Sequence, residues 1–174
     1  MSKVITFSRY FPAYHTRKGE PTYFVEQIQN SLISMNWEID LYKNINPPMK
    51  FLESLTKENV GYKHHTIRAG NRWKVGDKFS PRVWSGKPYN SKQIIIAPDI
   101  EIKKVWDVKV EKNHFQDDDG TIAIVTKIII DGMHKTENYE KLAANDGLNI
   151  DDLCNWFYKP MEGQIICWNE NITY

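Results

Sequence analysis

The pattern of this sequence changes from helical to extended at the stretch GYKHHTIR, residues 61–68. In an extended segment, Thr66 and Arg68 share one face while Ile67 points to the core. Lys63 lies at the junction between loop and strand, where it can bend back over Thr66. The stretch therefore begins the sheet part of the chain. It also brings an amine, a hydroxyl and a guanidinium close together, which suits either attack on a polar carbonyl or a grip on phosphate or base.

The segment before this stretch has the periodicity of a helix. Apolar residues recur at helical spacing, namely Phe24, Ile28, Leu32 and Met35. We predict a helix over about residues 21–41 and a second, short helix over residues 49–55, separated by a proline pair. A short strand is expected before them at residues 4–7. Residues of about 15–60 are therefore interpreted as a helical insertion after the first strand.

The remaining chain predicts strands first and helices later. Runs rich in β-branched residues and separated by turn formers lie at residues 79–84, 93–97, 102–110, 122–130 and 163–168. Helices are expected over residues 138–144 and 150–157, with Asn149 as the N-cap of the second. Short strands with peripheral helices predict one α+β domain over residues 1–174, built as a small mixed β-barrel.

Composition excludes several classes of protein. The 23 basic and 22 acidic residues leave a net charge of +1, so only a local cluster can attract nucleic acid or a membrane. Cys154 and Cys167 lie among apolar neighbours and are expected to be buried free thiols. No apolar run is long enough to span a bilayer, and we expect a soluble, cytoplasmic protein with no membrane partner.

A metal centre is not predicted. His64 and His65 suggest one together with His114 or His134, but a strand can present only one of two adjacent side chains to a cleft. No carboxylate or cysteine cluster has ligand spacing.

With these residues placed, the chain resembles the ASCH domain family, a branch of the PUA-like β-barrels. The family motif Gly-x-Lys-x-x-Glu-x-Arg is matched by Gly61, Lys63 and Arg68, with Thr66 at the glutamate position. The small bacterial N4-acetylcytidine amidohydrolases of this family also carry threonine there, and they resemble this chain at Gly76-Asp77 in the following turn. The resemblance implies a PUA-like barrel, no cofactor, and hydrolysis of an N4-acyl group from cytidine as a nucleoside or within RNA.

The resemblance also implies residue roles. Thr66 would attack the acyl carbonyl, Lys63 would take its proton, and Asp146, at the position of a family glutamate, would help protonate the departing amine. Arg68 would bind substrate. Apart from the resemblance, Trp73, Trp84 and Tyr89 lie near the motif among basic residues, and aromatic residues interleaved with cations suit base stacking and phosphate contact. A lysine in an open cleft would add little packing, so its removal would change stability little.

Each of these residues also has a structural interpretation. Lys63 is compatible with a surface lysine beside a turn, and Thr66 with an ordinary strand threonine. Asp146 is compatible with a helix end, and Arg68 with an ion pair to Asp77 across the sheet. For the tryptophans, core packing is the alternative to base stacking.

Two other functions remain open. A non-catalytic module would use the same cleft to bind RNA or a modified base, with Lys63 and Arg68 on phosphate and Trp84 on the base. A regulatory protein would instead dock through the helical insertion.

Overall fold

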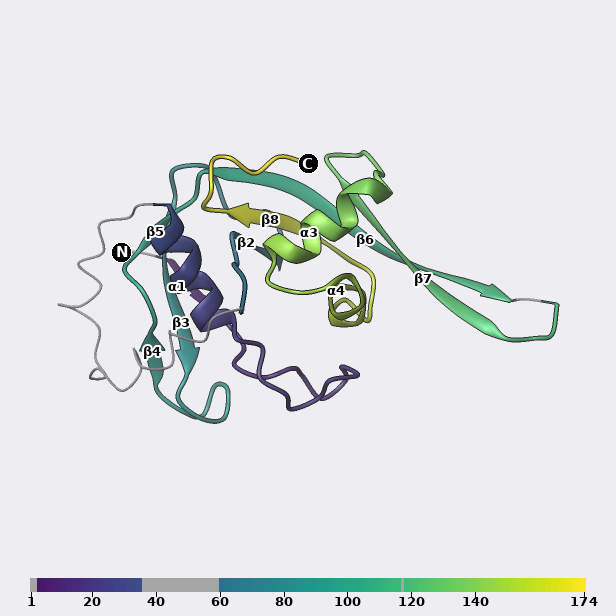
Figure 1. Cartoon of the computed structure of the whole chain (residues 1–174), viewed down its shortest axis with the longest axis horizontal. Helices are drawn as coiled ribbons and strands as arrows, with labels where there is room; N and C mark the ends of the chain where they lie inside the picture. The colour runs from purple at the N-terminus through teal and green to yellow at the C-terminus, as the bar shows by residue number, and fades with distance from the viewer. Residues whose placement is uncertain (1–2, 36–59, 117) are drawn as a thin grey trace.

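Two four-stranded sheets and the helices beside them make up the computed structural model, which describes residues 3–35, 60–116 and 118–174 (Figure 1). The first sheet has β3 (Lys78–Trp84) at its centre. β1 (Lys3–Thr6) pairs with β3 in parallel, and β4 (Gln93–Ile95) and β5 (Ile100–Glu101) pair with it antiparallel.

The second sheet is antiparallel throughout. Its order is β2 (His65–Ala69), β8 (Met161–Cys167), β6 (Lys104–Gln116) and β7 (Ile122–Ile130). The far ends of β6 and β7 extend away from the rest of the chain as an arm, at the right of Figure 1. β6 is longer than predicted because polar residues such as Asn113 and His114 face solvent there, where they carry no apolar signal.

The α+β class is confirmed, whereas backbone pairing among the described residues does not close the sheets into a barrel. β1 and β2 are edge strands of different sheets. A side chain links them instead, because Arg68 Nη2 donates to the carbonyl oxygen of Thr6 at 2.8 Å. Instead of the predicted β-barrel, the described residues form two sheets, and a side chain bridges their edges.

The helices agree with the sequence where they are described. α1 (Phe24–Ser34) lies within the predicted helix 21–41. The second predicted helix, at 49–55, and most of the proposed insertion lie outside the described residues. α3 (Tyr139–Asn145) follows the 3-10 turn η2 (Thr136–Asn138). α4 (Ile150–Trp156) begins at the predicted cap, since Asn149 Oδ1 accepts from the Asp152 amide at 2.7 Å.

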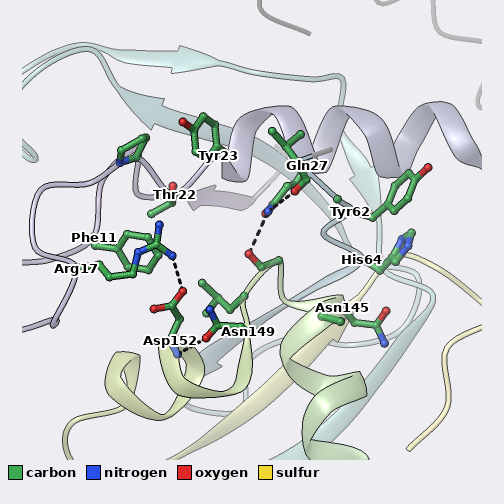
Figure 2. A pocket seen from close by; sticks show the side chains of 16 residues that line it. Phe11, Arg17, Thr22, Tyr23, Gln27, Tyr62, His64, Asn145, Asn149 and Asp152 are labelled. Carbon is green, nitrogen blue, oxygen red and sulfur yellow. Dashed lines mark hydrogen bonds and ion pairs between the residues drawn. The ribbon is translucent and has the colours of Figure 1, made fainter. Parts of the chain in front are cut away.

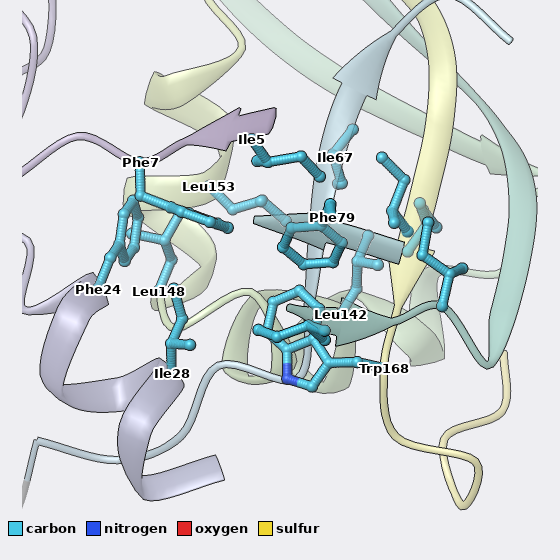
Figure 3. Close-up of a cluster of buried hydrophobic side chains, with 14 of the residues drawn as sticks. Ile5, Phe7, Phe24, Ile28, Ile67, Phe79, Leu142, Leu148, Leu153 and Trp168 are labelled. Atoms are coloured by element: carbon cyan, nitrogen blue, oxygen red, sulfur yellow. The ribbon is translucent and has the colours of Figure 1, made fainter. Parts of the chain in front are cut away.

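One apolar core joins the sheets to the helices (Figure 3). Ile5, Ile67 and Phe79 come from the strands, while Phe24 and Leu142 come from α1 and α3. Burial of this face accounts for the helical spacing in the sequence, because apolar area removed from water is the main driving force of folding.

Several smaller predictions are settled by position. Trp73 is buried against Phe79, so core packing is its role. Both cysteines are free, and Cys167 is buried whereas Cys154 is partly exposed. Among the described helices, none has the length and apolar character needed to cross a membrane.

Candidate functional site

Lys63 and Asp146 form an ion pair in the interior. The Lys63 Nζ lies 2.6 Å from the Asp146 Oδ1, and it also donates to the main-chain oxygen of Asp146. Both residues are buried. Lys63 is therefore not a surface lysine, and Asp146 does more than end a helix.

Backbone contacts place the two residues face to face. The Lys63 amide donates to the Gln27 oxygen of α1 at 3.1 Å, and the His64 amide donates to the Asn145 oxygen at 2.7 Å. The segment before β2 is thereby held between α1 and the end of α3. These two backbone hydrogen bonds involve only main-chain atoms, and the side chains of Lys63 and Asp146 point into the interior.

Gly147 sets the direction of the Asp146 carboxylate. Its φ of +75° is a left-handed conformation that glycine adopts without strain. A Cβ at this position would also overlap Gln27 Oε1. The Gln27 amide group holds the turn in place by donating to the Val60 oxygen at 2.8 Å and to the Gly147 oxygen at 3.1 Å. The carboxylate of Asp146, just before this turn, lies inside the protein.

Two rings complete the surroundings of this pair. The Lys63 Nζ lies 4.1 Å from the centre of the Phe24 ring, which is a cation–π contact. The buried His65 ring has its Nδ1 3.4 Å from Asp146 Oδ1 and makes no hydrogen bond within the described residues. Sequence reasoning assigned Phe24 to the core and His65 to a possible metal pair. No local signal links either to Asp146, because the contacts are long-range.

Burial and charge oppose one another in this cluster. Burial lowers the pKa of Lys63, while the Asp146 carboxylate acts to raise it. Burial acts to raise the pKa of Asp146, but Lys63 and His65 hold the pKa of that carboxyl below its usual range. Asp146 is therefore a carboxylate at neutral pH, and it accepts hydrogen bonds without carrying a proton of its own.

Thr66 lies on β2, buried and opposite Ile166 of β8. Alternation along the strand puts it on the face of Arg68. The Thr66 hydroxyl makes no hydrogen bond with any described residue. Its oxygen is not completely enclosed, unlike the buried Nε of Arg68, which also lacks a partner among these residues. The residue as a whole is only 4% exposed, so little of the hydroxyl can reach solvent.

Arg68 does not pair with Asp77, which corrects one structural interpretation. Asp77 pairs with Lys3, with 2.6 Å between Nζ and Oδ2. Arg68 instead bridges to Thr6, as described above, and its guanidinium lies 5.2 Å from the centre of the Phe7 ring. The arginine thus holds the two sheets together and keeps part of its guanidinium for other contacts.

All three residues predicted to bind substrate line one cavity of about 580 Å³, which we call the Arg68 cavity. Its walls include Arg9, Tyr10, Arg68, Trp84, Ser85 and Tyr89. The Trp84 and Tyr89 rings pack at 5.3 Å between centroids. Its volume is in the range of small-molecule sites.

A second cavity, of about 610 Å³, has chain neighbours of Lys63 and Asp146 in its walls (Figure 2). Tyr62 and His64, which flank Lys63, and Asn145 and Gly147, which flank Asp146, line it. None of the predicted site residues does. Sequence reasoning missed it because its walls come from four separate segments of mostly neutral residues.

The two histidines of the motif lie on different sides of the chain. His64 Nδ1 lies 2.7 Å from Ser31 Oγ, whereas His65 faces Asp146. Within residues 3–35, 60–116 and 118–174, no three His, Cys, Asp or Glu side chains are grouped so as to hold a metal ion.

No family model matches this sequence, and no curated protein or solved structure matches the chain.

Proposed function

We propose that this protein is an amidohydrolase of the ASCH type, with a PUA-like fold, that removes an N4-acyl group from cytidine. The observation that carries the proposal is the contact between Lys63 and Asp146. The family resemblance assigns both residues to one site although they lie 83 positions apart, and their side chains meet at 2.6 Å.

The proposed reaction begins at Thr66. Lys63 in its amine form takes the Thr66 hydroxyl proton while Oγ1 bonds to the acyl carbon, so the carbonyl oxygen becomes an oxyanion. When the carbon–N4 bond breaks, the Lys63 ammonium returns that proton to N4, which yields cytidine and an acyl ester on Thr66. Water then attacks the ester, again with Lys63 carrying the proton, and the acyl group leaves as a carboxylic acid.

The charge of Asp146 changes the role that the resemblance implies for it. A carboxylate whose pKa is held low has no proton to give at neutral pH. In this proposal Asp146 orients Lys63 and stabilises the ammonium that forms during the reaction. Burial, which lowers the pKa of Lys63, increases the fraction of amine available as a base.

The test is release of cytidine and acetate from N4-acetylcytidine. Thr66→Val, which keeps the shape and removes the hydroxyl, should lower kcat by about a thousandfold or more. Thr66→Ser should retain part of the activity. The control is Thr126→Val, at another strand threonine, on β7, where the lost hydroxyl accepts a hydrogen bond from Lys112 Nζ at 2.6 Å. A folded wild-type protein without turnover, or a Thr66→Val variant with full turnover, would reject the hydrolase.

A non-catalytic binding module is the second candidate. Two observations favour it. The ammonium of Lys63 is enclosed and already has partners, and Arg68, Trp84 and Tyr89 line a cavity that does not include Lys63. This candidate predicts saturable binding of N4-acetylcytidine without release of acetate. Equal binding by a Trp84→Ala variant would count against it.

A further inference from the structure

The walls of the Arg68 cavity are positively charged. Arg9 comes from the segment after β1 and Arg68 from β2, while none of the described residues in the cavity walls is an Asp or Glu. Neither arginine takes part in an ion pair with a described residue. The nearby Asp146 carboxylate is occupied by Lys63. Two guanidinium groups on one cavity, neither of them in an ion pair with a described residue, favour an anionic ligand.

Arg68 has donors to spare. A guanidinium carries five N–H groups, and within the described residues one acceptor, the Thr6 oxygen, is bonded to that of Arg68. Its Nε is enclosed and without a partner. Burial lowers the pKa of Arg68 to about 10, so the group stays charged at neutral pH. An oxyanion on the cavity side would offset the cost of burying this charge.

The walls of the cavity also offer aromatic surface. Trp84 is half-buried, whereas Tyr89 is 88% exposed and leans on it. Tyr89 also has a φ of +65°, a left-handed conformation that is uncommon for a bulky residue. Strain of this kind persists where the surrounding structure holds the residue in place, and it is common at ligand sites. The two rings suit the face of a heterocyclic base.

We propose that the Arg68 cavity binds a cytidine nucleoside monophosphate, with its base against Trp84 and Tyr89 and its phosphate held by Arg9 and Arg68. The choice of cytidine as the base rests on the proposed function. The phosphate is inferred separately, from the positive charge of the cavity walls. The cavity presents two cations and the whole chain has a net charge of only +1. That favours a single phosphate, since polynucleotide binders neutralise many.

Binding is measured by calorimetry with cytidine, 5′-CMP, 3′-CMP, inorganic phosphate and a cytidine oligoribonucleotide. One of the two monophosphates should bind about tenfold more tightly than cytidine. That preference should shrink as salt is added, because it comes from charge. Inorganic phosphate alone should bind more weakly than the preferred nucleotide, because it lacks a base to stack.

Arg9→Gln tests the second cation, because Arg9 is exposed and its replacement leaves the bridge between the sheets intact. This variant should bring the affinity ratio of nucleotide to cytidine close to one. The matched control is Lys92→Gln, which removes one exposed positive charge from the loop after β3 and does not line the cavity. It should keep the ratio. Thermal unfolding confirms that both variants are folded.

Equal affinity for nucleotide and cytidine, or an unchanged ratio in Arg9→Gln, would overturn the proposal. So would the absence of binding, inorganic phosphate binding as tightly as nucleotide, or an oligoribonucleotide binding far more tightly than either monophosphate. Failure of the hydrolase is separate. Nucleotide preference without turnover would reject the amidohydrolase and keep this site, whereas turnover of N4-acetylcytidine without nucleotide preference would do the reverse.

Discussion

Two lysine–aspartate pairs in this protein have the same length and different surroundings. Lys63 and Asp146 lie 2.6 Å apart with side chains that are 2% and 7% exposed. Lys3 and Asp77 also lie 2.6 Å apart, with side chains that are 44% and 28% exposed. Each pair joins distant parts of the chain. The comparison teaches that enclosure, and not distance, decides what such a pair does.

The pKa shifts have different causes in the two pairs. Burial dominates at Lys63, where it lowers the pKa of the amine. At Asp77, the hydrogen bond from Lys3 lowers the pKa of the carboxyl and burial contributes less. Water and salt screen the outer pair, whereas the inner pair interacts through a medium of low polarity. Enclosure therefore sets the charge balance of the inner pair.

Breaking the enclosed pair should have the largest effect. Lys63→Met leaves the Asp146 carboxylate buried without its partner, and should lower the free energy of unfolding by about 3–5 kcal/mol. This reverses the expectation for a lysine in an open cleft. Urea denaturation measures the change. The double variant Lys63→Met/Asp146→Leu removes both charges and should regain most of the loss. A double variant as unstable as the single one would show that packing, and not charge, sets the cost.

The two glycines beside the acids allow a matched test of the enclosed turn. Gly147 follows Asp146 and Gly76 precedes Asp77, and both have a left-handed φ, of +75° and +87°. The Cβ that Gly76→Ala adds has no atom within 4 Å. This variant should lower the free energy of unfolding by roughly 1–2 kcal/mol, from backbone strain alone. Gly147→Ala adds the overlap with Gln27 and should cost more. Equal losses in thermal unfolding would mean that Gln27 moves aside freely.

Lowering the pH should affect stability differently through the carboxyl groups of Asp146 and Asp77. The folded pKa of Asp146 is below its ordinary value of 3.8, so its contribution to stability is complete above that pH. The contribution is lost as the pH falls through the folded pKa, because the unfolded chain takes up the proton first. Asp146→Asn should remove part of the acid destabilisation, measured as unfolding free energy against pH. Asp77→Asn should remove less, and an identical pH dependence in both variants would contradict the comparison.

The exposed pair should give the smallest effect. Lys3→Gln should change the unfolding temperature only slightly, and salt should erase the difference from wild type. Measurement at about 0.05 M and about 0.5 M NaCl tests this. A difference that persists at high salt would show that Lys3 acts through its packing on Trp73, whose ring centre lies 5.1 Å from the Nζ.

The sequence predicted the local elements well, and it did so through short-range signals. The run 122–130 is β7, and the described part of the predicted helix 21–41 contains α1. Asn149 caps α4 as expected. β6 was underestimated because its solvent-facing end does not need apolar residues.

The sequence was less informative about the candidate site. It singled out Lys63, Thr66, Arg68 and Asp146, but it did not distinguish a surface lysine from an enclosed one. It offered Asp77 as the partner of Arg68, whereas Lys3 holds that carboxylate. It gave no indication of the place of His65 against Asp146, or of Arg9 in the Arg68 cavity. Each of these depends on segments that are far apart in the chain.

By itself, the sequence determined the α+β class, the strand that starts near Lys63 and the helix cap at Asn149, because periodicity and capping act between near neighbours. Only the tertiary structure decided that the strands form two sheets bridged by Arg68 and that Lys63 and Asp146 are shut away from water. Burial and partner choice are set by which distant surfaces pack together, and no local pattern encodes them.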